Sequence, residues 1–215
     1  MASILIVDDH EIVRAGFKRI FEASGLHEVI GEASSSEEGV TAFKVLSPDL
    51  VIMDVMMPGG DISSAIQRIK NHDKNARVLI VTLYDHPSLA ERCFKVGARG
   101  FVTKASSGQV LIQAINELLN GQRFLSPDLS EKIALNQLDG TNLNSLECLS
   151  PRELEVFMRI ARGQSIAEIS DQMHLSKKTV SNYSSRIKKH LNVTTTAEFV
   201  HLAIQEGIVS CSEHQ

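Results

Sequence analysis

The sequence predicts a doubly wound parallel α/β domain followed by a small all-α domain of four helices. Over about the first 125 residues, short apolar runs alternate with amphipathic helical patterns, which is typical of successive βα units. A polar, turn-forming stretch, "DGTNLNS", comes next, and from Leu149 the pattern is helical to the end. We therefore expect an α/β domain at 1–124, a short helix and linker at 125–147, and a helical domain at 148–215.

Five apolar runs predict the strands of the first domain. Several are apolar at consecutive positions, as in strands that are buried on both faces of a parallel sheet. The predicted strands are Ile4–Val7, Val29–Ala33, Leu50–Met53, Val78–Thr82 and Gly100–Thr103.

Amphipathic helices are predicted between and after these strands, with apolar residues at helical spacing. The apolar stripe of the first helix is predicted to contain Ile12, Val13, Phe17, Ile20 and Phe21. That of the last is predicted to contain Val110, Leu111, Ala114, Ile115, Leu118 and Leu119. Gly97 and Gly121 stand where helices should end.

The second part of the chain begins with one short helix, predicted in "SPDLSEKIALNQL" with Ser126 or Asp128 near its start. After the linker, Ser150 and Glu153 have the spacing of a capping box, with Pro151 in the first turn. This pattern predicts the start of the first of four short helices.

Charge is distributed unevenly along the chain, whose formal net charge is −4. Residues 1–147 contain 14 basic and 19 acidic residues, whereas residues 148–215 contain 8 and 7. Five basic residues and no acidic one lie within 172–197, which is a hint of nucleic-acid binding.

The composition favours a soluble protein of the cytoplasm that does not contact membranes. No apolar run approaches the roughly 18 residues that cross a bilayer, and the N-terminus lacks the pattern of a signal peptide. The three cysteines, Cys93, Cys148 and Cys211, are odd in number and far apart, so we expect reduced thiols rather than disulfides or a zinc site.

Charged and hydroxyl side chains follow the predicted strands. Asp8 and Asp9 follow the first strand, Asp54 follows the third, Thr82 ends the fourth, and Lys104 follows the fifth. In an open parallel sheet the carboxyl ends of the strands form the reactive edge, so these five side chains should converge if the four strands adjoin. Any one of these aspartates alone would be read as a strand-end cap, but the five together predict a site.

Three clustered carboxylates repel one another unless a cation neutralises them, and hard oxygen ligands suit Mg²⁺. A carboxylate in such a site can attack a phosphoryl group. The metal, the lysine and the hydroxyl would then stabilise the phosphoryl oxygens. The sequence therefore predicts a Mg²⁺-dependent aspartyl-phosphate site.

Four segments of this part of the chain resemble the receiver domain of bacterial two-component response regulators, which has a flavodoxin-like fold. They are "VDDHEIVRAG", "VIMDVMMPGG", "VTLYD" and "GFVTKA", and the resemblance covers roughly residues 3–121. The family usually has Gly–Leu where this chain has Ile62 and Ser63, so the loop beside Asp54 departs from the pattern.

This resemblance implies a role for each pocket residue. Asp54 would be the phosphoacceptor, and Asp8, Asp9 and the backbone carbonyl of Met56 would bind Mg²⁺ with it. Thr82 would be the switch hydroxyl, Phe101 the switch aromatic and Lys104 the partner of the phosphate.

The basic segment of the second domain reads as helix, turn, helix. Val180, Ile187 and Leu191 form the buried stripe of its second helix. The opposite face carries Lys178, Asn182, Ser185 and Lys189, flanked by Ser181 and Arg186. Amide, hydroxyl and cationic groups of this kind suit base edges and phosphates in a major groove. A merely solvated helix face is the alternative, but no acidic residues interleave to pair with these cations.

The segment "LSPRELEVFMRIARGQSIAEISDQMHLSKKTVSNY" resembles the LuxR-type helix-turn-helix of NarL/FixJ-class regulators, over about residues 148–208. The resemblance implies base contacts from Ser181, Asn182 and Ser185. It implies contacts to the DNA backbone from Lys178, Thr179, Tyr183, Arg186 and Lys189. The overall layout is similar to that of the GacA/UvrY/SirA type of regulator.

Together these resemblances imply a transcriptional regulator, not an enzyme, that is activated by phosphorylation. Its partners would be a sensor histidine kinase, promoter DNA and a second copy of the chain on phosphorylation, with RNA polymerase as a further candidate. Two other classes stay open. One is a metal-dependent phosphohydrolase, although such enzymes place two aspartates two residues apart after the first strand. The other is an interaction module that binds RNA or protein, although the helical part lacks aromatic platforms.

Overall fold

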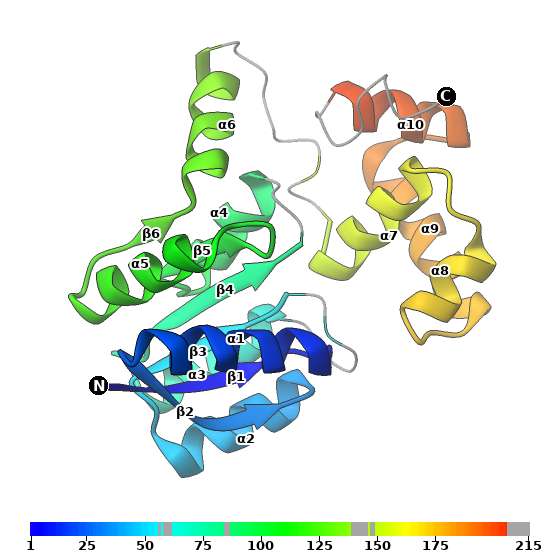
Figure 1. Ribbon diagram of the computed structural model, residues 1–215. Coiled ribbons are helices and arrows are strands. Elements are labelled where there is room, and N and C mark those ends of the chain that lie inside the picture. The colour runs from blue at the N-terminus through cyan, green and yellow to red at the C-terminus, as the bar shows by residue number, and fades with distance from the viewer. Residues whose placement is uncertain (56, 58–61, 84–86, 139–145, 147–148, 206–215) are drawn as a thin grey trace. The chain divides into compact units, whose positions relative to one another are not determined.

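The computed structural model describes residues 1–55, 57, 62–83, 87–138, 146 and 149–205 (Figure 1). Its contacts divide the chain into two compact units, Met1–Asp139 and Gly140–Gln215. Each unit has its own buried core, so each is described by itself.

The first unit contains a parallel sheet in the order β2-β1-β3-β4-β5-β6. Its strands are β1 (Ala2–Val7), β2 (His27–Ala33), β3 (Leu50–Met53), β4 (Val78–Thr82), β5 (Gly100–Thr103) and β6 (Phe124–Leu125). The doubly wound parallel sheet is confirmed, but the prediction of five strands is wrong by one. The additional strand, β6, pairs only two residues with β5, at Gly100 and Phe101, and a run that short has no periodicity to read.

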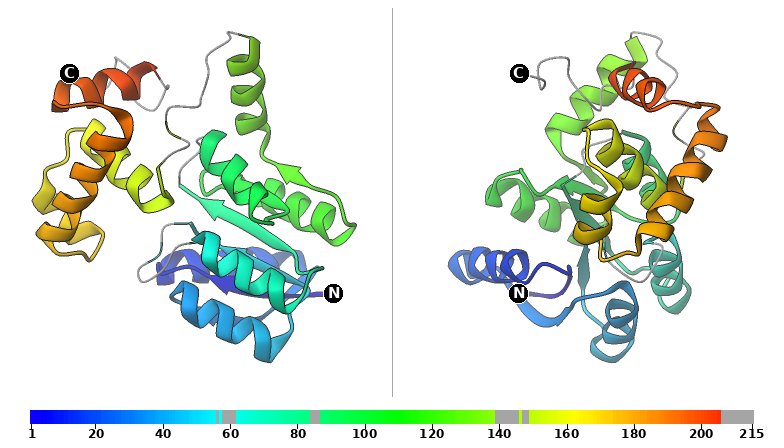
Figure 2. Two further views of the ribbon diagram at one scale, coloured as in Figure 1. Left: turned by 180° about the vertical axis from the view of Figure 1, so that it is seen from behind. Right: turned by 90° about the vertical axis from the view of Figure 1, so that its right-hand side faces the viewer.

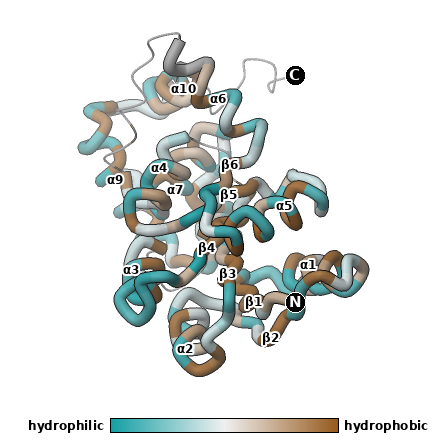
Figure 3. The backbone as a smooth tube through the Cα atoms, turned by 90° about the vertical axis from the view of Figure 1, so that its left-hand side faces the viewer, coloured by the Kyte–Doolittle hydropathy of each residue, from teal (hydrophilic) through white to brown (hydrophobic). Residues whose placement is uncertain are grey.

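Helices cover both faces of this sheet. They are α1 (Glu11–Ser24), α2 (Ser36–Leu46), α3 (Ile62–His72), α4 (Pro87–Lys95) and α5 (Gly108–Leu119). A further helix, α6 (Pro127–Leu138), follows β6, contacts α4 and extends beyond the sheet (Figure 1). Figures 2 and 3 show α1 and α5 on one face and α2, α3 and α4 on the other. Because both faces are covered, the inner strands β3, β4 and β5 are buried along their whole length, as their continuous apolar runs predict.

One core cluster lies between the sheet and the α1/α5 layer. Phe21 of α1 and Leu111, Ala114, Ile115 and Leu118 of α5 pack there against the strands. The predicted stripe of α1 is wrong at one position, because Ile12 is 87% exposed. At about 100° per residue it lies about 180° from Phe21, on the opposite side of the helix from the buried stripe.

The second unit consists of four helices, as predicted: α7 (Pro151–Ala161), α8 (Ile166–Gln172), α9 (Lys177–Leu191) and α10 (Thr196–Gln205). The capping box predicted at the start of α7 is present, since Ser150 and Glu153 each bond the other's backbone N–H. A second capping box, between Ser165 and Glu168, begins α8. These bonds satisfy backbone donors that a helix start otherwise leaves without partners.

Packing in this unit is centred on α7, which contacts both α9 and α10. The rings of Phe157 and Phe199 lie 5.3 Å apart and join α7 to α10. Between α8 and α9 the chain turns at His174, whose φ of 51° is left-handed. Val180 and Ile187 of α9 are fully buried, whereas Leu191, predicted in the same stripe, is only partly buried near the end of the helix.

Among the described helices, none combines the length and the apolar character that crossing a bilayer requires.

Candidate functional site: an acidic pocket and a basic helix

Strand register brings the predicted pocket residues to one edge of the sheet. Val7 of β1 is paired with Met53 of β3, so Asp8 and Asp54 leave neighbouring strands at the same level. Asp54 N–H also donates to the Val7 carbonyl over 2.9 Å. On the next strand pair, Thr82 lies opposite Thr103, and Lys104 N–H donates to the Thr82 carbonyl over 2.7 Å. Convergence of these strand ends is therefore a consequence of the strand order.

Lys104 connects two of the aspartates. Its Nζ lies 2.6 Å from Asp8 Oδ2 and 2.7 Å from Asp54 Oδ2. All three side chains are buried, with 7%, 2% and 4% of their surface exposed. Contacts this short between buried opposite charges are charge-assisted hydrogen bonds, which hold the ammonium between the two carboxylates.

Two opposing effects act on the pKa of Lys104. Burial of the ammonium works to lower it, but the charges and hydrogen bonds of Asp54 and Asp8 outweigh burial, and the pKa is raised above the ordinary lysine value. Lys104 therefore remains a cation at neutral pH and can interact with an anion.

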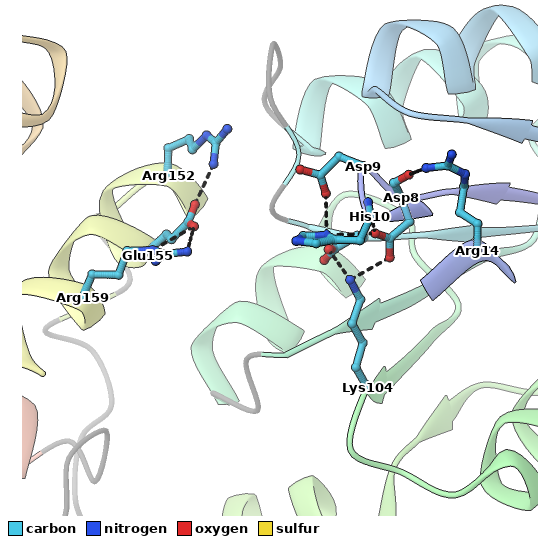
Figure 4. A network of polar contacts seen from close by, with 9 residues as sticks. Asp8, Asp9, His10, Arg14, Lys104, Arg152, Glu155 and Arg159 are labelled. Carbon is cyan, nitrogen blue, oxygen red and sulfur yellow. Dashed lines mark hydrogen bonds and ion pairs between the residues drawn. The ribbon is translucent and has the colours of Figure 1, made fainter. Parts of the chain in front are cut away.

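Two residues to which the sequence assigned no role also contact the pocket (Figure 4). His10 Nδ1 lies 3.2 Å from Asp8 Oδ1 and 2.9 Å from Asp9 Oδ1. Arg14 Nη1 donates to the Asp8 carbonyl over 2.7 Å, and its Nε lies 3.2 Å from Glu32 Oε2. Their positions in the sequence could have indicated these contacts, because both residues follow the aspartate pair no later than the first turn of α1.

The pocket has the charge and donor set of a cation site. One oxygen or nitrogen from each of Asp8, Asp9, His10 and Asp54 lies within 4.8 Å of the other three. Three carboxylates face one ammonium, which leaves an excess of negative charge. Asp9 Oδ1 is buried, and it faces the His10 ring over 2.9 Å. A divalent cation would neutralise the excess negative charge, so this acidic cluster could bind a metal.

Three further residues were predicted to belong to the pocket: Thr82, Phe101 and Met56. Thr82 and Phe101 are both fully buried, at the end of β4 and within β5. Met56, the predicted source of a carbonyl ligand, lies outside the described residues.

Helix α9 presents the predicted DNA-contacting residues in two groups. The exposed group contains Lys178, Asn182, Ser185, Arg186 and Lys189. The partly buried group contains Thr179, Ser181 and Tyr183. The buried side of the helix, at Val180 and Ile187, faces the core of the unit, so the polar residues lie on its accessible side.

Some of these polar side chains already form hydrogen bonds within the second unit. Ser176 Oγ accepts from Thr179 N–H over 3.0 Å and caps α9, and it also bonds the Thr179 hydroxyl. Ser185 Oγ donates to the Ser181 carbonyl. Lys188 Nζ donates to the Thr194 carbonyl beyond the end of the helix, whereas its neighbour Lys189 is exposed.

A network of charged and amide side chains connects α7 and α8 in the second unit (Figure 4). Glu155 is 2% exposed and pairs with Arg152 over 2.7 Å and with Arg159 over 2.9 Å. Arg159 also donates to Gln164 and Gln172. The network joins α7 to α8 and so helps to fix the helix that precedes α9.

Both parts of the chain match known families. Residues 4–116 match the family described as response regulator receiver domain, and residues 147–203 match that of bacterial regulatory proteins, luxR family. The response regulator UvrY of Escherichia coli strain K12 is 35% identical over 209 residues, which are 97% of this chain and 96% of that protein. The response regulator GacA of Pseudomonas aeruginosa is 33% identical over 214 residues, 99% of this chain and 100% of that protein.

A solved structure of the response regulator RcsB in complex with DNA has a similar architecture. It is 25% identical in sequence, with a TM-score of 0.59, and the match covers 97% of this chain and 99% of that one. The predicted resemblances are confirmed by these matches, and the phosphohydrolase alternative is set aside. The chain therefore belongs to the two-component response regulators that join a receiver domain to a LuxR-family DNA-binding domain, and it is a transcriptional regulator rather than an enzyme.

Proposed function

We propose that a sensor histidine kinase phosphorylates Asp54 and that the phosphorylated chain binds promoter DNA as a homodimer through α9. Asp8, Asp9, Asp54 and the backbone carbonyl of Met56 would hold Mg²⁺ in the pocket. The observation that carries this proposal is the position of Lys104 Nζ between Asp8 and Asp54, at the carboxyl edge of the sheet.

The reaction is a displacement at phosphorus. A carboxylate oxygen of Asp54 attacks the phosphorus of a phosphohistidine, an O–P bond forms as the P–N bond breaks, and the released imidazole takes up a proton from solvent. When bound, Mg²⁺ neutralises negative charge on the phosphoryl oxygens.

Residues of the chain supply the other functions of the pocket. Lys104 already lies against Asp54, so its ammonium can follow a phosphoryl oxygen with a small movement of a flexible side chain. Thr82 donates a hydrogen bond from its hydroxyl to the phosphoryl group, and the buried Phe101 ring repacks in response. These movements rebuild the surface through which two chains associate.

DNA is bound by the accessible side of α9. Ser181, Asn182 and Ser185 face the bases. Lys178, Thr179, Tyr183, Arg186 and Lys189 contact the backbone. A homodimer places two such helices on paired half-sites.

The working protein is organised as a receiver domain at 1–124, a short helix and linker at 125–147, and a DNA-binding domain at 148–215. It acts in the cytoplasm, where promoter DNA is available, and RNA polymerase is a further partner once the dimer is bound. Support for these boundaries comes from the family matches at 4–116 and 147–203.

Genomic footprinting of the wild-type chain beside Asp54→Ala tests the proposal. We expect specific sites to be occupied by the wild type after treatment with acetyl phosphate and Mg²⁺, and occupancy to fall strongly in the variant. A phosphate-affinity gel run on the same samples reports whether Asp54 is labelled. Equal occupancy by both proteins would remove phosphorylation from the mechanism.

A further inference from the structure

The Nδ1 atom of His10 faces the acidic pocket, although 58% of the side chain is exposed and the helix that it begins does not require this contact. His10 is the N-cap residue of α1, but its side chain makes no capping hydrogen bond. Serine, threonine, asparagine and aspartate are the usual residues at such a position because their side chains cap the helix. The imidazole instead faces the carboxylates of Asp8 and Asp9 (Figure 4).

The ring nitrogen is close enough to share a cation with the carboxylates. Nδ1 lies 3.2 Å and 2.9 Å from oxygens of Asp8 and Asp9, and the set of four possible ligand atoms spans no more than 4.8 Å. Two ligands with bonds of about 2.2 Å to one ion lie at most about 4.4 Å apart. These separations are compatible with a shared ion after a small movement, once the ring carries its proton on Nε2, because an Nδ1–H that donates to a carboxylate has no lone pair for a metal.

A nitrogen donor changes which cations a site prefers. Carboxylate and carbonyl oxygens suit Mg²⁺, whereas imidazole suits first-row transition metals, whose affinity for nitrogen-containing sites rises along the series from Mn²⁺ to Cu²⁺. Mg²⁺ gains little from an imidazole, because it favours oxygen ligands and keeps several waters.

We propose that His10 Nδ1 is an additional ligand in this pocket, so that the pocket binds divalent transition metals such as Mn²⁺ more tightly, relative to Mg²⁺, than its carboxylates alone would. The inference rests on the proposed metal-assisted phosphorylation of Asp54 and specifies which class of cation can serve it. A cell that is low in Mg²⁺ and supplied with Mn²⁺ could then load the same pocket.

Metal titrations of the full chain test this proposal. Electron paramagnetic resonance of free Mn²⁺, with Mg²⁺ as competitor, gives both dissociation constants for the wild type, His10→Gln and His201→Gln. His201 is an exposed histidine of α10 and serves as the matched control. Electron spin-echo spectra of bound Mn²⁺ report directly whether a nitrogen is coordinated.

We expect a nitrogen coupling in the wild type and in His201→Gln, and its loss in His10→Gln. The preference for Mn²⁺ over Mg²⁺ should fall about tenfold in His10→Gln, the lower end of losses seen for residues that support a metal ligand. A wild type without nitrogen coupling, or an unchanged preference in His10→Gln, would overturn the proposal.

Labelling of the wild type by acetyl phosphate with Mg²⁺ separates this proposal from the function on which it rests. If Asp54 is labelled but no nitrogen coupling is found, His10 is not a ligand and the proposed function stands. If the nitrogen coupling is found but Asp54 is never labelled, His10 is a ligand and the phosphorylation account fails.

Discussion

At the scale of single residues, Lys104 determines the charge balance of the pocket. Its ammonium lies against two carboxylates that are 2% and 4% exposed. Burial removes all three groups from water, so each charge depends on its partners. In the proposed reaction, the same cation that lies between the two carboxylates would also bind the phosphoryl group.

Replacing Lys104 by Met should therefore lower the free energy of unfolding of the first unit by about 3 kcal/mol at pH 7, because two buried carboxylates are left without their counter-ion. Denaturant unfolding in the presence of a metal chelator measures this decrease. Lys104→Arg, which keeps the charge, is the control and should be destabilised clearly less.

The pH dependence of this contribution has a definite sign. The pKa of Lys104 is raised in the folded chain above its ordinary value of 10.5. Its contribution is therefore fully present below pH 10.5 and is lost as the pH rises through the folded value. Wild type and Lys104→Met should differ by a constant amount from pH 7 to pH 10, and converge only in stronger alkali. A difference that already disappears by pH 9 would contradict the ion-pair explanation.

The residue types at the strand ends were sufficient to predict that Asp8, Asp54 and Lys104 lie close together, because the strand order of a parallel sheet brings those positions to one edge. The same reasoning could not find His10 and Arg14. Their contacts depend on the direction of each side chain in the first turn of α1, and neither strand order nor helical periodicity specifies that direction.

At the scale of elements, two adjacent lysines of α9 have different surroundings: one bonds the backbone of its own unit and the other is exposed. Lys188 donates to the Thr194 carbonyl and helps to hold the connection to α10. Lys189 is exposed on the side of the helix that carries Asn182 and Ser185. A count of basic residues treats the two lysines alike, but their surroundings differ.

This difference predicts unequal effects on DNA binding. Lys189→Gln should reduce the slope of log K against log salt concentration by about 0.9 if Lys189 neutralises one phosphate, because fewer counter-ions are then released. Lys188→Gln is the matched control and should leave the slope unchanged, while weakening the connection between α9 and α10. Fluorescence anisotropy with promoter DNA measures both slopes. A salt range of about 50 to 200 mM is wide enough to resolve them. Equal slopes for the two variants would count against α9 lying along the DNA as proposed.

Element boundaries were predictable wherever a local signal exists. The capping box at Ser150 and Glu153 fixed the start of α7, and the continuous apolar runs located β3, β4 and β5 at their observed bounds. The two residues of β6 were missed because they become a strand only through pairing with β5. Ile12 was wrongly assigned to the core because it is apolar, whereas helical periodicity places it about 180° from Phe21, on the exposed side of α1.

At the scale of the whole molecule, the chain consists of two units, Met1–Asp139 and Gly140–Gln215, that differ in class and in core. One core lies between a sheet and its helices, around residues such as Phe21 and Ile115. The other lies among four helices, around Phe157 and Phe199. A signal received by the acidic pocket must therefore alter DNA binding in a unit that does not share its core.

If Mg²⁺ binds the acidic pocket as proposed, it should raise the thermal transition of the first unit and leave that of the second unit in place. A ligand present at a hundred times its dissociation constant stabilises the folded state by about 2.7 kcal/mol. Differential scanning calorimetry of the full chain, with Mg²⁺ and then with a chelator, measures both transitions.

Asp9→Asn should abolish the shift, because it removes a carboxylate charge from the pocket while keeping the size of the side chain. Lys189→Gln, which changes a charge in the second unit, should show the same Mg²⁺ shift as the wild type. If both transitions move together by the same amount, the two units unfold as one, and communication between them already exists before phosphorylation.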